Sequence, residues 1–83
     1  MSLEQIDRLK LIWDEERLTA TWLADRTGID EKRWRSVRAK RVEIRGSEIE
    51  QISKIFPEYG YWLLTGIELP ESGQISPMTK KAQ

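Results

Sequence analysis

Apolar side chains recur at spacings of three and four residues near the start of the chain. This stripe consists of Leu3, Ile6, Leu9, Ile12 and Trp13. Because an α-helix turns once in about 3.6 residues, such positions fall on one of its faces. The pattern predicts a helix over residues 2–17 with Ser2 as its N-cap and the stripe facing the core. Leu11 lies partly outside the stripe and is a candidate for a partner surface.

A second helix is predicted to begin after Thr19 and to end at Gly28. The Thr19 hydroxyl can accept a hydrogen bond from a backbone N–H of the first turn, and glycine reaches the positive φ that ends a helix without a Cβ clash. After a turn that contains the apolar Ile29, Asp30 can cap a third helix. Two short helices joined by a few residues around a glycine are typical of a helix-turn-helix.

The third helix combines an apolar face with a basic one. Trp34 and Val37 are three residues apart, so they share a packed face with Ile29. The opposite face, and the segment after the helix, hold the cations Lys32, Arg33, Arg35, Arg38, Lys40, Arg41 and Arg45. Residues 32–45 contain a single acid, Glu43, and should therefore attract a polyanion.

A fourth helix is predicted after a loop at residues 40–46. Ser47 and Glu50 have the spacing of a capping box, in which each side chain bonds the backbone N–H of the other residue. The apolar positions that follow again recur at helical spacing: Ile49, Ile52, Ile55 and Phe56. Pro57 stops the helix. We expect the stripe to pack inside the domain.

A fifth helix over residues 58–65, ended by Gly66, has more large apolar side chains than one short face can bury. Trp62 and Leu63 are predicted to close the core. The remainder are candidates for a dimer contact: Tyr59, Tyr61, Leu64 and the following Ile67. The sequence leaves open whether the core takes all of them.

The chain is predicted to divide into a domain of residues 1–66 and a tail of residues 67–83. The tail has Pro70, Gly73 and Pro77 and no sustained hydrophobic period. Such a segment is expected to be flexible or to contact the second copy of a dimer.

Composition indicates one small all-α domain with an uneven charge distribution. The 83 residues are 39% hydrophobic, which suffices for one modest core. The net charge is zero, yet residues 26–45 carry +5, residues 1–25 carry −3 and residues 46–83 carry −2. A basic face on a neutral molecule is expected to bind DNA with strong salt dependence.

The chain contains no cysteine and no histidine, which excludes disulfides, Cys/His zinc sites and the usual nucleophilic triads. The consecutive carboxylates Asp14, Glu15 and Glu16 point in different directions around a helix and cannot converge on one ion. We therefore predict no enzyme, catalytic residue, metal site, cofactor or small-molecule ligand. Apolar runs of four or five residues are too short for a signal peptide or a membrane span, so a cytoplasmic location is expected.

Taken in order, these features resemble the Cro-type, lambda-repressor-like helix-turn-helix domains of phages and prophages, over residues 5–66. The resemblance is carried by Leu23-Ala24 before Gly28, by Ile29, and by the closing Trp62-Leu63-Leu64-Thr65-Gly66. The ending FPEYGYWLLTG is similar to small prophage-encoded regulators of the filamentous-phage immunity-repressor kind.

The resemblance implies a compact five-helix fold in which residues 30–39 form a recognition helix for the major groove of double-stranded DNA. Carried over by position, the base-reading residues are Glu31, Lys32, Arg35 and Ser36. Position or charge assigns the DNA backbone to Thr19, Thr21, Arg33, Arg38, Lys40, Arg41 and Arg45. Relatives often have Gln in place of Ala20 and Gly in place of Lys40, which leaves the end of the recognition helix open.

These features favour a sequence-specific transcriptional regulator, a repressor that binds a palindromic operator as a homodimer, because one copy reads only about four to six base pairs. An antitoxin or an excision accessory factor would use the same fold on DNA. The alternative of another class is a protein-interaction module, which Tyr59, Tyr61 and Leu11 would support. Absence of duplex binding at low salt would favour that alternative.

Overall fold

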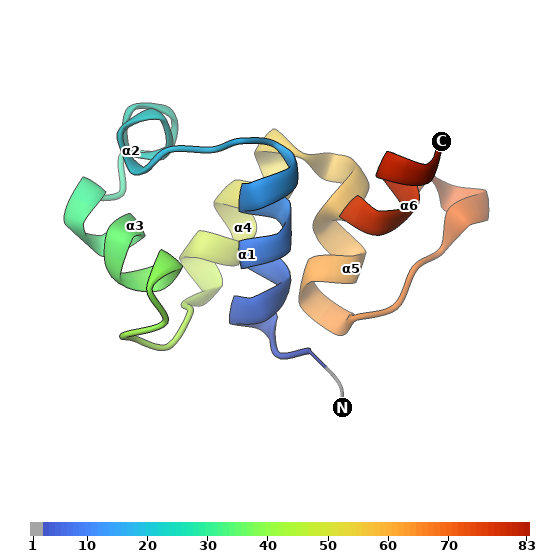
Figure 1. Cartoon of the computed structure of the whole chain (residues 1–83), viewed down its shortest axis with the longest axis horizontal. Coiled ribbons are helices and arrows are strands. Elements are labelled where there is room, and N and C mark those ends of the chain that lie inside the picture. Colours follow the sequence, from blue (N-terminus) through green and yellow to red (C-terminus); the bar gives the residue numbers. More distant parts are fainter. Residues whose placement is uncertain (1–2) are drawn as a thin grey trace.

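The computed structural model describes residues 3–83, and this range contains six α-helices. They are α1 (Gln5–Glu15), α2 (Ala20–Thr27), α3 (Glu31–Arg38), α4 (Gly46–Ile55), α5 (Gly60–Thr65) and α6 (Pro77–Ala82). Short 3-10 turns at Pro57–Tyr59 and Pro70–Ser72 precede α5 and α6. Along the longest axis, α2 and α3 form one end, α1 and α4 the middle, and α5 and α6 the other end (Figure 1). The predicted all-α fold is confirmed, although the described residues contain six helices where five were predicted.

Helix α1 runs through the middle of the core. The apolar stripe is buried from Ile6 to Trp13, as its spacing predicted. Leu3, however, is 44% exposed, and its predicted core position is wrong. The helix begins only at Gln5, after a capping box between Glu4 and Asp7, so Leu3 lies outside the helical period. The predicted N-cap, Ser2, falls outside the described residues.

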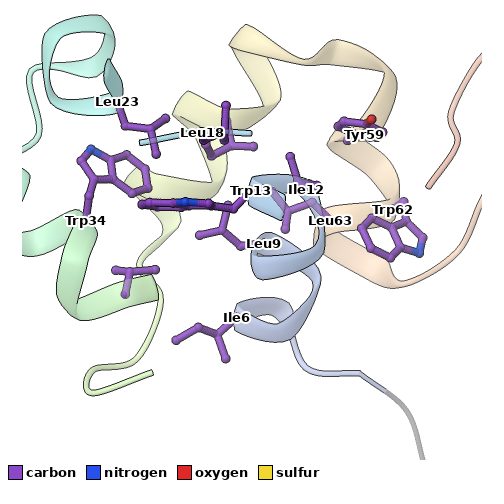
Figure 2. Close-up of a cluster of buried hydrophobic side chains, with 12 residues drawn as sticks. Ile6, Leu9, Ile12, Trp13, Leu18, Leu23, Trp34, Tyr59, Trp62 and Leu63 are labelled. Carbon is purple, nitrogen blue, oxygen red and sulfur yellow. The ribbon is translucent and has the colours of Figure 1, made fainter. Parts of the chain in front are cut away.

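Core side chains lie on both sides of α1, as Figure 2 shows. Toward α2 and α3, the rings of Trp13 and Trp34 lie 6.4 Å apart at 59°, next to the buried Leu23. Toward α5, Trp62 and Leu63 are buried, as predicted. One continuous cluster therefore joins the helix-turn-helix to the C-terminal helices.

The cap of α4 differs from the prediction. The helix begins at Gly46, and the backbone N–H of Arg45 donates to Glu48 Oε1 at 2.7 Å. Ser47 is exposed and Glu50 instead pairs with Lys54 one turn later, so the predicted Ser47–Glu50 box is wrong. Because Glu48 is buried and also bound from α3, its contacts place the start of the helix.

Residues 67–83, predicted as a flexible tail, contain a short helix that packs against α1. Ser76 caps α6 by accepting a bond from the Thr79 N–H at 3.2 Å, and Pro77 occupies the first turn. Before it, the Ile75 N–H donates to the Glu58 carbonyl at 2.8 Å. A Ser-Pro pair can start a helix, but Pro70 and Gly73 close by made the whole segment resemble a series of turns.

Between residue 3 and residue 83, no helix combines the length and the apolar character needed to cross a membrane.

Candidate nucleic-acid interface

Local capping bonds set the geometry of α2, the turn and α3. The Trp22 N–H donates to Thr19 Oγ1 at 3.1 Å, and Gly28 ends α2 with φ of 75°. Asp30 then caps α3 by accepting from the Lys32 N–H at 2.9 Å. All three features match the sequence predictions. The indole N–H of buried Trp34 donates to Thr27 Oγ1 at 3.1 Å, so α3 is tied directly to α2.

The four predicted base-reading residues lie together on the accessible part of α3. Lys32 and Arg35 are exposed, and Glu31 and Ser36 are partly exposed. The opposite side of the helix is buried through Trp34 and Val37, so α3 cannot rotate without disrupting the core. That these residues touch bases stays a prediction.

Glu31 bonds to α2 through one carboxylate oxygen and to the next turn of α3 through the other. Its Oε1 accepts from the Thr21 hydroxyl at 2.6 Å, and its Oε2 pairs with the Arg35 guanidinium one turn later. The hydroxyl bond and the arginine hold the pKa of Glu31 below its ordinary value. The Arg35 side chain is 56% exposed and keeps further N–H donors for a ligand.

Arg33, which the sequence assigned to the DNA backbone, is bound within the fold, where it links α3 to α4. Its guanidinium makes two bonds to the Glu48 carboxylate, Nε to Oε2 at 2.5 Å and Nη2 to Oε1 at 3.0 Å. Nη2 also donates to the Glu43 carbonyl at 2.6 Å. The Arg33 and Glu48 side chains are only 16% and 1% exposed.

The ionisation of Glu48 follows from this link. Burial raises the pKa of the Glu48 carboxyl, but the hydrogen bonds from Arg33 and from the Arg45 backbone outweigh burial and lower it overall. The carboxylate thus stays charged inside the protein, where it neutralises Arg33. The segment from residue 32 to residue 45 therefore offers one cation fewer to a polyanion than the sequence predicted.

The remaining cations near α3 lie at the surface. Arg38 Nη2 pairs with Asp14 at 2.8 Å, and Lys40 Nζ pairs with Asp7 at 2.6 Å. The bond to Asp7 also raises the pKa of Lys40. Three further cations are exposed and have no ion pair within the described part of the chain: Lys32, Arg41 and Arg45. Exposed ion pairs contribute little stability, so Arg38 and Lys40 can exchange their carboxylate partners for another anion.

Lys40 sets the end of α3, the predicted recognition helix. It has a φ of 59°, the left-handed conformation that glycine adopts easily. Its N–H donates to the Val37 carbonyl and the Arg41 N–H to the Ser36 carbonyl, both at 3.0 Å. The helix therefore ends where a glycine would end it, although lysine costs about 1 kcal/mol there.

The predicted dimer residues separate into one buried and three exposed side chains. Tyr59 is fully buried and donates its hydroxyl to Glu16 Oε2 at 2.7 Å, so the folded protein cannot use it as a dimer contact. Tyr61, Leu64 and Ile67 are exposed and remain candidates.

Arg8 has a structural role that its position in the sequence did not signal. Arg8 falls on the polar side of the predicted stripe, yet it is 8% exposed. Its Nε donates to the Leu63 carbonyl at 2.9 Å and its Nη2 to the Leu64 carbonyl at 3.3 Å. It thus satisfies the last carbonyls of α5, which have no partners within the helix.

No family model matches this chain, and no curated protein matches it. Among solved structures, it is similar to Pf6r from the filamentous phage Pf6 of Pseudomonas aeruginosa PA01. The two share 32% sequence identity and a TM-score of 0.80, over 92% of this chain and 97% of that one. The expected similarity to filamentous-phage proteins is confirmed, whereas the Cro-type assignment stays a prediction. The chain belongs to the family of the filamentous-phage protein Pf6r.

Proposed function

We propose that this protein is a phage-type transcriptional regulator, a repressor that binds a palindromic DNA operator as a homodimer. In this proposal, α3 is the recognition helix of a Cro-type, lambda-repressor-like domain. The main support is the α2–turn–α3 pair, in which Trp34 and Val37 lock one side of α3 into the core while Lys32 and Arg35 project from the other. A rigid helix with an exposed basic face suits the major groove.

Base reading would fall to the exposed face of α3. Lys32 and Arg35 carry the donors that pair with guanine O6 and N7, and Ser36 can bond to several bases. Glu31 can accept from a cytosine amine once Arg35 has turned to the DNA. The Arg35–Glu31 pair is exposed, so its loss costs little free energy.

Phosphate contacts would come from the two edges of the helix-turn-helix. Thr19 and Thr21 are exposed at the start of α2, and Lys40, Arg41 and Arg45 are exposed in the segment after α3. They would fix the orientation of the protein without selecting a sequence. Arg33 takes no part because Glu48 occupies it.

We expect a dimer because a single recognition helix contacts only a short stretch of DNA. Two copies must place their recognition helices about 34 Å apart to enter successive major grooves on one side of the duplex. The molecule measures 36 × 27 × 20 Å, which is compatible with that spacing. The exposed Tyr61, Leu64 and Ile67 lie on or just after α5, away from α3 (Figure 1), so a contact there would leave both basic faces free.

Selection of duplexes from a random pool tests the proposal. We expect the selected sequences to share a palindrome with half-site centres about ten base pairs apart, and log affinity to fall linearly with log salt. A Lys32→Gln, Arg35→Gln double variant should no longer enrich a common sequence from the pool. Its matched control is Lys54→Gln, Lys81→Gln, which removes the same charge from α4 and α6. Absence of binding to any duplex at low salt would contradict the proposal.

A further inference from the structure

An open hollow lies beside α3, on the side that faces α1 and the start of α2. It is lined by Trp13, Ala20, Arg35, Arg38, Ala39 and Arg41. Three of these side chains are guanidinium groups from one turn of α3 and the segment after it. The hollow adjoins the proposed base-reading face and shares Arg35 with it.

The aromatic floor of the hollow holds Arg38 in place. The Arg38 guanidinium carbon lies 6.0 Å from the centre of the Trp13 ring, within the range of a cation–π contact. Trp13 is itself 8% exposed and packs against Trp34, so the ring cannot move away. Arg38 makes one bond to Asp14, at 2.8 Å. A guanidinium has five N–H groups, and several therefore remain for an anion.

Arg41 and Ala20 complete the cationic surroundings. The left-handed residue Lys40 turns the chain back so that the Arg41 N–H bonds to Ser36, which keeps Arg41 beside α3. Ala20 is the first residue of α2, and its N–H has no carbonyl one turn earlier to bond within the helix. Two of the arginines that line the hollow are paired with carboxylates, Arg38 with Asp14 and Arg35 with Glu31.

We propose that this hollow binds one phosphate group of the DNA backbone through Arg38 and Arg41, and that the phosphate displaces Asp14 from Arg38. Guanidinium groups bind phosphate oxygens in a planar, two-bond geometry that suits this ligand. The Arg38 and Asp14 side chains are 36% and 51% exposed, so solvent already weakens the pair that must break. The site rests on the proposed function, because the phosphate belongs to a bound duplex.

Removal of either member of the Arg38–Asp14 pair tests the site with effects of opposite sign. Arg38→Gln and Arg41→Gln should each weaken binding about fivefold on the selected operator and on an unrelated duplex alike, with a shallower salt slope. Asp14→Asn should strengthen binding about threefold on both duplexes, because Arg38 no longer has a competing partner. Fluorescence anisotropy with labelled duplexes measures these affinities, and thermal unfolding verifies that each variant is folded.

The opposite signs separate phosphate binding from a merely structural role. Arg38→Gln and Asp14→Asn break the same ion pair, so a structural effect would move both affinities in the same direction and would overturn the site. Glu50→Gln, which breaks the exposed Lys54–Glu50 pair on α4, is the matched control and should change nothing. If the unchanged protein binds duplexes and both arginine variants bind as tightly, the site is wrong while the proposed function stands. If the unchanged protein binds no duplex, both are wrong.

Discussion

Cations at the two ends of the molecule are held in different ways. Near the α2–α3 end, three cations each pair with one carboxylate, and their side chains are at least 36% exposed: Arg35, Arg38 and Lys40. At the α5–α6 end, cations are held by several groups at once. Arg8 is 8% exposed and reaches two carbonyls of α5. Lys80 contacts two carboxylates, at 3.0 and 3.1 Å, and lies 5.3 Å from the centre of the Tyr59 ring.

This difference separates cations that can bind a ligand from cations that hold the fold. A single exposed ion pair contributes about 0 to 1 kcal/mol, so a phosphate can replace the carboxylate. A cation with several partly buried partners leaves unsatisfied groups behind if it moves. Both kinds are lysines and arginines in the sequence, and only the groups that they contact in the folded protein distinguish them.

The largest expected effect is on the free energy of unfolding and concerns Arg33. This cation of α3 has several partners, like Arg8 and Lys80. Arg33→Ala should lower the free energy of unfolding by about 3 kcal/mol, because Glu48 would stay buried without its partner. Denaturant unfolding at neutral pH measures the change. Lys54→Ala, at the exposed pair with Glu50, is the control and should cost less than about 0.5 kcal/mol. Equal small effects at the two sites would remove the distinction between the two kinds of cation.

The next effect concerns binding and leaves stability almost unchanged. On the proposed function, Arg35→Ala should weaken binding to the selected operator by about 1 to 3 kcal/mol and relax the preference at one base pair. Arg45→Ala should instead weaken all duplexes alike. Titration of a panel of single-base operator variants separates the two. If Arg35→Ala altered neither affinity nor preference, the proposed register of α3 on DNA would be wrong.

A smaller effect is expected at Lys80. Lys80→Met should lower the free energy of unfolding by about 1 kcal/mol, because two partly exposed ion pairs are lost while the apolar stem is kept. Amide hydrogen exchange should show the loss mainly in α6 and not in α3. Uniform loss of protection across the chain would mean that α6 does not open independently. The neighbouring Lys81→Met, at an exposed side chain without such pairs, is the control.

The same contact should depend on pH. Burial raises the pKa of Glu16, but hydrogen bonds from Tyr59 and Lys80 outweigh it and lower the pKa below its ordinary 4.5; Glu16 and Glu58 raise the pKa of Lys80 above 10.5. The carboxylate contribution is therefore lost as pH falls through the lowered pKa, and the amine contribution as pH rises through the raised one. Protection of α6 should be greatest between about pH 5 and pH 10. Lys80→Met should flatten this dependence.

The smallest effect is expected for Lys40→Gly. Glycine relieves about 1 kcal/mol of left-handed strain at φ of 59°. It also removes the exposed pair with Asp7 and adds freedom to the unfolded chain, which together offset most of the gain. Thermal unfolding should show a net change within about 0.5 kcal/mol. A destabilisation well above that would mean that the Asp7–Lys40 pair belongs with the structural cations.

Local features of the fold could be predicted from the sequence because they depend on residues within one helical turn. The caps at Thr19 and Asp30, the left-handed Gly28 and the burial of Trp34 are of this kind. The prediction of a Ser47–Glu50 cap failed because Arg33, from another helix, binds Glu48 and not Glu50. The helix is therefore capped at Arg45, two residues before the predicted cap.

The basic segment of the candidate site was visible in the sequence, but its division between ligand and fold was not. Lys32, Arg33 and Arg35 are close neighbours in the chain, yet only Arg33 points toward α4 and the buried Glu48. No local pattern marks Glu48 as its partner, because the two are fifteen residues apart. The same reason hid the role of Arg8, whose carbonyl partner Leu63 is 55 residues away.

By itself, the sequence determined the first five helices, the glycine turn, most of the apolar stripes and the segment in which positive charge is concentrated. Hydrogen bonds and side-chain periodicity within a few residues are sufficient for these features. Only the tertiary structure decided which cations stay exposed, that Tyr59 is buried, and that residues 77–82 pack as a helix against α1. These outcomes depend on carboxylates, carbonyls and rings that are distant in the chain and meet only when the helices pack.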